Sequence, residues 1–414
     1  MNILTNKSEA KSTFRQQVLF CLAILYFSLQ YVFKDDSAAV FILGALALIM
    51  FVLGTNKKSN VFFDKFPTFV FVFVAYCLMS VLWAKYDMLA IRRGLSMVKI
   101  YVMILFLYVT FVGNLDTRKL LKVTMWGGFF AILFSFLTIG IYEIILMAQL
   151  GDRMGNEEFI NVNVLATLAA NVVIINAFFI IHEKLTWDIV IDLPCLLMIA
   201  VCGSRRAIIV LIVGILCIYF LKNARQGLLS FIFKSTIVLV VAFFIINYLS
   251  DLPMFYVISS RMEGMTNFLS GSGPVDNSLD VRAQMIEVGL KLFQENPILG
   301  IGLDNARMFN PKFGAYLHNN YAELAADLGI IGLFLYYGII LYPLFKIYKS
   351  KRYNTKYYAA VATLIFSMLL SDYGVVSFYY KEYYFYIIIF YVYLNELNIN
   401  KKNILRSQWK EQEK

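Results

Sequence analysis

The sequence predicts an all-α polytopic membrane protein, and three observations lead to this class. Hydrophobic residues make up 60% of the 414 residues, whereas charged residues make up only 15%. The mean hydropathy is +0.69, which is far from the balance of a soluble domain. Apolar runs also recur along the chain with the length that a helix needs to cross a bilayer.

The apolar runs predict about twelve membrane-spanning helices. They lie near 18–33, 38–54, 67–84, 94–113, 123–148, 164–181, 187–202, 207–221, 231–250, 329–346, 357–376 and 378–396. The weakest are 187–202, which Asp192 and Pro194 interrupt, and the short run 207–221. We therefore expect an N-terminal transmembrane bundle of about nine helices (1–250), one long loop (251–328), and about three C-terminal helices with a tail (329–414).

Lysine and arginine clusters orient these helices. A cytoplasmic N-terminus places the basic clusters at 7–15, 57–65, 118–122 and 346–356, and the tail after 397, on the cytoplasmic side. Both termini are then cytoplasmic, and the loop 251–328 is extracytoplasmic. The net charge of +10 mostly follows from this pattern and implies no nucleic-acid partner. The five cysteines lie within predicted spans, with neither disulfide nor metal spacing.

Arginine is enriched on the predicted outer face. That side holds eight arginines and six lysines, whereas the cytoplasmic side holds five arginines and 18 lysines. The outer arginines are Arg92, Arg93, Arg153, Arg205, Arg206, Arg261, Arg282 and Arg307. A guanidinium binds two phosphate oxygens at once, which an ammonium cannot do. A multiply charged anion bound at this face would explain why arginine is used there. The alternative is attraction to anionic headgroups, or ion pairs with acids such as Glu157 and Glu158.

Arg205 and Arg206 stand in the turn GSRR, at the very end of a predicted span. Such a position lets a guanidinium point into a cavity between helices, where unpaired polar groups are costly. Lys99 lies about a turn and a half inside the fourth predicted span and either lines the same cavity or extends to the outer surface.

The long loop 251–328 carries two predicted short helices. The first covers 279–294, where apolar residues recur at helical spacing, and the second runs from about His318 to Asp327. A tight, Pro- and Gly-rich connection joins them at 296–306. The two helices predict a cap over a membrane cavity. A passive lid is the alternative, and Arg282, Arg307 and His318 in this loop argue against it.

The available side chains favour glycosyl transfer from a lipid-linked pyrophosphate. The sequence has no Walker loop, GxGxxG, HExxH, CxxC or DxD motif, so we expect neither a cofactor nor a metal. Arginines can stabilise a departing pyrophosphate, and a base can activate a sugar hydroxyl. His318 is the first choice for this base, because imidazole accepts a proton near neutral pH. Glu323, Asp327 and Glu287 are the acidic alternatives.

Four segments resemble the O-antigen ligase and polymerase family, whose members act on undecaprenyl-pyrophosphate-linked glycans at bacterial membranes. LHNNYAELAADLGIIGL is similar to the family's His-Asn-x-Tyr helix followed by paired glycines. LDVRAQMIEVGLKLFQENPILGIGLDNA resembles its loop segment, in which an arginine opens a helix and an Asn-Pro…Gly-x-Gly turn closes it. RMGNEEFINVNVLATLA and GSRRA resemble its Arg-x-Gly…Asn run and its Ser-Arg turn. These segments cover 153–337 in the expected order.

The resemblance implies roles for particular residues. By position, Arg205 and Arg282 would bind the pyrophosphate, with Arg206 as the alternative to Arg205, and His318 would activate the acceptor. Asp327 stands where relatives usually have glutamate. The further candidate substrate-binding residues are Arg153, Asn163, Asn319, Tyr321, Arg92, Arg93 and Arg307. A GT-C-like fold in the bacterial inner or plasma membrane is also implied.

The predicted function is polymerisation of undecaprenyl-pyrophosphate-linked repeat units into surface polysaccharide, either O-antigen or capsule, without a metal. A ligase that transfers the glycan to lipid A core or to a protein is the alternative. A flippase or exporter of the same glycan and a non-enzymatic scaffold are rival interpretations. The implied partners are a glycan donor, a glycan acceptor and the lipid bilayer, together with a chain-length regulator and a flippase.

Overall fold

The computed structural model describes residues 2–32, 37–54, 59–140, 142–143, 146–147, 161–184, 189–222, 267, 270, 277–310, 314–350 and 355–412. Its helices are α1 (Asn2–Val32), α2 (Ser37–Gly54), α3 (Lys65–Met79), α4 (Asp87–Phe111), α5 (Thr117–Ile139), α7 (Val162–Glu183), α8 (Ile189–Cys202), α9 (Arg205–Lys222), α12 (Asn277–Glu295), α13 (Asn320–Lys349), α14 (Tyr358–Ser371) and α15 (Lys381–Gln412). No strand occurs among these described residues. Each predicted span overlaps one of these helices, except 231–250, which lies outside the described part; the span 123–148 overlaps α5 only as far as Ile139.

Within the described residues, five helical segments are long and apolar enough to cross a membrane. They are Lys65–Leu82, Asp87–Phe111, Thr117–Ile139, Val162–Glu183 and Asn320–Lys349. Shorter apolar helices cover Ala39–Gly54, Ile189–Cys202 and Tyr358–Ser371. The prediction of an all-α, multi-pass membrane protein is confirmed, whereas the number of twelve spans and the GT-C-like topology stay predictions.

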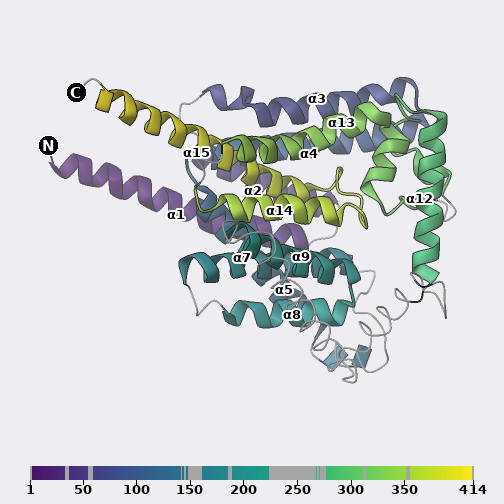
Figure 1. Ribbon diagram of the computed structural model, residues 1–414, viewed down its shortest axis with the longest axis horizontal. Helices are drawn as coiled ribbons and strands as arrows, with labels where there is room; N and C mark the ends of the chain where they lie inside the picture. Colours follow the sequence, from purple (N-terminus) through teal and green to yellow (C-terminus); the bar gives the residue numbers. More distant parts are fainter. Residues whose placement is uncertain are drawn as a thin grey trace.

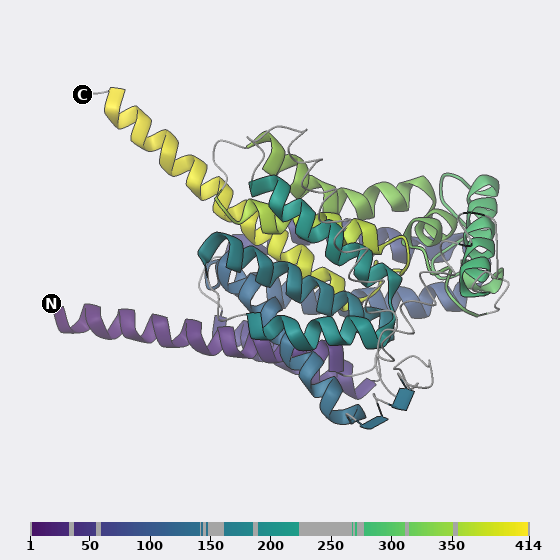
Figure 2. The ribbon, with the colours of Figure 1, turned by 60° about the horizontal axis from the view of Figure 1, so that its bottom comes forward.

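Most of the long helices run side by side as one bundle, and α12 crosses one end of it (Figure 1). Both chain termini lie at the opposite end, and the second view shows the same arrangement (Figure 2). Helix α15 passes through the bundle and is buried on every side over residues 384–394. A helix that is apolar all round is suited to such a central position.

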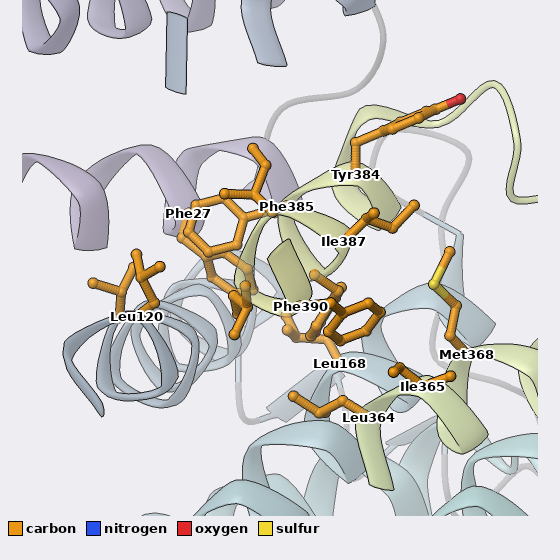
Figure 3. Close-up of a cluster of buried hydrophobic side chains, with 14 of the residues drawn as sticks. Phe27, Leu120, Leu168, Leu364, Ile365, Met368, Tyr384, Phe385, Ile387 and Phe390 are labelled. Atoms are coloured by element: carbon orange, nitrogen blue, oxygen red, sulfur yellow. The ribbon is translucent and has the colours of Figure 1, made fainter. Parts of the chain in front are cut away.

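The core forms where α15 meets the surrounding helices. Phe27 of α1, Leu120 of α5 and Leu168 of α7 lie around the first turns of α15, together with side chains of α14 (Figure 3). The Phe27 and Phe385 rings pack edge to face, with their centroids 4.8 Å apart. Close packing of this kind holds membrane helices together, because the surrounding lipid is as apolar as the core.

Helix α12 lies in the loop predicted to form a cap, and it packs on the start of α13. Its residues Met285 and Leu292 are buried in a cluster with Leu317, Ala322 and Ala326. The prediction of a helix over 279–294 is confirmed by the observed helix Asn277–Glu295. Its apolar face points to the bundle end, and its polar face carries Asp280 and Glu287, both exposed.

Helix α13 joins the second predicted short helix to the following span. It runs from Asn320 to Lys349, with one break at Gly329, whose φ is 65° and ψ −165°. A side chain at this position would collide with the carbonyl group of Ile298. Pro297 accepts a hydrogen bond from the amide of Ile330 at 2.9 Å. The Pro- and Gly-rich connection therefore docks directly on the break.

Candidate functional site

Tyr316 packs against His318, and two of the candidate arginines influence its phenol. Its ring centroid lies 4.2 Å from that of His318. Burial raises the pKa of Tyr316, and the positive charges of Arg206 and Arg282 oppose that rise. A side-chain hydrogen bond with Tyr380 also lowers the pKa of Tyr316. Two arginines from separate helices thus act electrostatically on the phenol that packs against His318, at the α12 end of the bundle.

The backbone at His318 is held in a left-handed conformation, with φ 55°. Residues other than glycine, asparagine and aspartate rarely adopt it, and it costs about 1–2 kcal/mol. Hydrogen bonds on the N-terminal side stabilise it: Leu317 donates its amide proton to Glu323 Oε2 at 2.6 Å. Asn310 Nδ2 donates to the carbonyl oxygen of Tyr316 at 3.2 Å. A strained residue held by its surroundings is typical of a functional position.

The residues that follow His318 fix the start of α13. Asn319 is the N-cap and accepts a hydrogen bond from the amide of Ala322 at 2.9 Å. Asn320 is fully buried and donates from its own amide to the carbonyl oxygen of Asp372 at 2.8 Å. Its side-chain oxygen accepts from the amide of Ser377 at 2.7 Å. The loop after α14 and the His318 loop are therefore clamped together by these two asparagines.

Arg206 is oriented by helix α7. Its Nε donates to Thr167 Oγ1 at 3.1 Å, and its Nη2 donates to the carbonyl oxygen of Asn163 at 2.8 Å. Asn163 thus contributes its backbone to the site through Arg206. Arg205 is half-buried beside it, as the first residue of α9. The charges that act on Tyr316 include that of Arg206.

Arg93 and Arg307 flank one buried carboxylate, Asp304. Arg93 Nε lies 3.3 Å from Asp304 Oδ2, and Arg307 Nη2 lies 2.6 Å from Oδ1. Burial raises the pKa of Asp304, and the two guanidinium charges oppose this. The Arg93 guanidinium also stacks on Tyr379, 4.2 Å from the ring centroid. Both arginines are therefore positioned by Asp304, at the same end of the bundle as Tyr316.

Asp327 and Glu323, two of the acidic alternatives, bind backbone amides. Asp327 is fully buried and accepts hydrogen bonds from the amides of Asp304 and Ala306 at 2.7 and 2.8 Å. Glu323, also fully buried, holds Leu317 as described above. These geometries fit carboxylates that shape the loops carrying Asp304 and His318.

The remaining predicted residues are dispersed. Arg92 is exposed on α4, and Glu287 is exposed on the outer face of α12. Tyr321 donates a hydrogen bond to the carbonyl oxygen of Leu369 at 2.8 Å, so it ties α13 to α14. Arg153 lies outside the described residues. In the part of the chain that is described, no three His, Cys, Asp or Glu side chains form a group that could hold a metal ion.

The loop between α14 and α15 contributes residues that the sequence did not single out. Tyr379 and Tyr380 lie in this loop, and Lys381 and Glu382 open α15 as a buried ion pair, 3.1 Å apart. The available signal was the Lys-Glu pair inside an apolar run predicted to span the membrane, because charges there are costly unless they are used. Tyr316 could have been noticed as the aromatic residue two positions before the rare histidine.

Comparison with known proteins supports the sequence resemblance. Residues 190–337 match the family model described as O-antigen ligase. The matched segment includes α8, α9, α12 and the first half of α13, and with them Arg206, Arg282 and His318. The resemblance proposed from the sequence is therefore confirmed. A search of curated proteins gave no match.

Proposed function

We propose that this chain, whose residues 190–337 match the O-antigen ligase family model, is a polysaccharide polymerase. Its donor is a glycan on undecaprenyl pyrophosphate, and its acceptor is a second lipid-linked repeat unit. The reaction takes place at the outer face of the bacterial inner or plasma membrane, on the bundle end that α12 covers. The observation that carries this proposal is that the Tyr316 ring packs against His318 while the positive charges of Arg206 and Arg282 both act on its phenol.

The chemistry divides between the arginines and the histidine. An acceptor hydroxyl oxygen attacks the anomeric carbon of the donor sugar, and the bond from that carbon to the pyrophosphate oxygen breaks. Its electron pair leaves with the pyrophosphate, whose growing negative charge Arg206 and Arg282 stabilise. The acceptor proton passes to the imidazole of His318. Attack opposite the leaving group inverts the anomeric configuration.

The neighbouring residues keep this arrangement fixed before substrate arrives. Thr167 and Asn163 use two donors of Arg206, which leaves part of its guanidinium for the ligand. Glu323 holds the loop that carries His318, and Asn319 and Asn320 fix this loop to the loop after α14. Such preorganisation is a large part of what an active site contributes, because the groups need not reorganise during the reaction.

Reconstitution with a defined donor tests the proposal. The purified protein is supplied with a synthetic undecaprenyl-pyrophosphate repeat unit, with and without EDTA. We expect products of more than one repeat, formed equally well in both conditions. Transfer only to an added lipid A core or protein acceptor would identify a ligase instead. A protein that forms no glycosidic bond, but moves the lipid-linked glycan across vesicles, would show that the transporter interpretation is correct.

A further inference from the structure

A groove of about 850 Å³ opens between α2 and α4, beside Tyr379 and Tyr380 of the loop before α15. Its apolar lining includes Phe41 and Leu48 of α2, both exposed, and Met103 and Phe106 of α4. Helix α2 has no charged residue along its whole length. An apolar, exposed surface on a membrane-spanning bundle faces lipid, so the groove is open sideways to the bilayer.

The polarity of the groove changes along α4. Arg93, Ser96 and Lys99 line one part, whereas Met103 and Phe106 line the other. The polar part is the one nearer the start of α4, where the amide of Tyr86 donates to Asn305 Oδ1 of the docked connection at 2.6 Å. From Arg93 to Phe106 the helix rises about 20 Å at 1.5 Å per residue. The groove is therefore cationic toward the α12 end of the bundle and apolar toward its middle.

The cationic end reaches the site through Tyr380. This residue lines the groove together with Lys381, and its side chain hydrogen-bonds with Tyr316. Tyr316 in turn experiences the charges of Arg206 and Arg282. Tyr380 and Tyr316 thus link the cationic end of the groove to the proposed pyrophosphate arginines.

We propose that this groove binds the polyprenyl chain of the lipid-linked donor, with its pyrophosphate beyond the Arg93 end, toward Arg206 and Arg282. The inference rests on the proposed function, because it assigns the donor of that reaction. The occupant has an anionic phosphate head and a long apolar chain, which match the two ends of the groove. Bulk phospholipid shares this general chemistry, and the experiment below separates the two sources.

Gly44 of α2 offers a way to fill the groove. It lines the groove, and a Cβ placed on it would meet nothing within 4 Å. A Gly44→Phe substitution therefore places a ring in open space, and within a helix it removes the conformational cost of glycine. Gly338 in α13 is the matched control: it is also helical, also has open space at Cβ, and is not among the groove residues.

The test compares two donors, one with the glycan on undecaprenyl pyrophosphate and one with the same glycan on geranyl pyrophosphate. The acceptor hydroxyl of each donor is blocked, so that it can act only as a donor. The acceptor is a separate, geranyl-linked repeat unit. We expect Gly44→Phe to lower kcat/KM for the undecaprenyl donor roughly tenfold or more, the loss expected when about two methylene groups lose their contacts. For the geranyl donor, kcat/KM should change less than about twofold, and Gly338→Phe should leave kcat/KM unchanged for both donors. Equal loss on both donors, or no loss on either, would overturn the assignment.

A binding measurement separates this inference from the proposed function. Native mass spectrometry with undecaprenyl phosphate requires no transfer, so it remains informative if the purified protein is inactive. We expect wild type and Gly338→Phe to retain this lipid in competition with phosphatidylglycerol, and Gly44→Phe to lose it. If phosphatidylglycerol competes equally, or if Gly44→Phe retains the polyprenyl lipid, the groove is not a donor site.

Discussion

At the scale of single residues, the left-handed backbone at His318 allows the chemical role of its ring to be separated from its structural role. Asparagine tolerates this conformation but accepts no proton near neutral pH. We expect His318→Asn to keep the thermal unfolding midpoint of the wild type and to lower kcat by roughly 10²–10⁴-fold, the usual contribution of a general base. The control is His182→Ala at the end of α7. Full activity of His318→Asn would remove His318 from the proposed mechanism.

The two proposed phosphate arginines should not tolerate lysine. Lysine keeps the charge but loses the planar pair of donors, and at position 206 it also loses the fixed bonds to Thr167 and Asn163. We expect Arg282→Lys and Arg206→Lys each to lower kcat/KM roughly a hundredfold. Arg118→Lys, which alters a pair with Glu183 at the far end of α7, should stay near wild type. An unimpaired Arg282→Lys would contradict bidentate binding.

The sequence could predict which residue types form the site but not which of two neighbours faces it. Arg205 and Arg206 point about 100° apart on a helix, so the choice depends on how α9 packs on α7, where Thr167 holds Arg206. Tyr316 was equally hard to predict, because its role arises from contacts with residues far away in the sequence. His318 was found because histidine is rare in this chain and this one lies beside a span.

At the scale of elements, the connection between α12 and α13 depends on glycine where two backbones meet. Gly300 has a φ of 70°, and a Cβ there would collide with the backbone of Asp327. Gly314 has a φ of 81°, but a Cβ on it meets nothing within 4 Å. We expect Gly300→Ala to lower the unfolding midpoint and the transfer rate far more than Gly314→Ala, which bears only the conformational cost of about 1–2 kcal/mol. Equal effects would show that close approach is unimportant.

Periodicity was sufficient to predict α12 but not the continuity of α13. An amphipathic helix outside the membrane has a clear apolar face, and 279–294 agrees with Asn277–Glu295. The break at Gly329 is set by a separate segment, since the carbonyl group of Ile298 occupies the space beside it. A sequence pattern describes one segment at a time and cannot indicate such docking.

The clamp between α13 and the loop after α14 makes stability depend on pH. Tyr337 and Asn320 donate hydrogen bonds to Asp372 Oδ2 at 3.0 and 3.2 Å. Burial raises the pKa of Asp372 from 3.8 to about 7. Between these values the folded protein keeps a proton that the unfolded chain releases, so the free energy of unfolding falls as pH rises through this window. Thermal unfolding at pH 5 and pH 8 should show a larger decrease in midpoint for wild type than for Asp372→Asn. Identical pH dependence in the two proteins would contradict this contribution.

At the scale of the whole molecule, the proposed function requires the α12 end of the bundle to face outward. Both termini lie at the opposite end (Figure 1), in agreement with the basic clusters predicted to be cytoplasmic. We expect a membrane-impermeant maleimide to label Glu287→Cys, exposed on α12, in spheroplasts. Lys401→Cys, exposed near the end of α15, should react only after the membrane is opened. The parent chain is labelled in parallel to give the background, because Cys21 is exposed and Cys217 half-buried, whereas Cys77, Cys195 and Cys202 are buried. The reverse pattern would place His318 on the cytoplasmic side, where a polymerase of outer-leaflet glycans has no substrate, and the proposed function would fail with it.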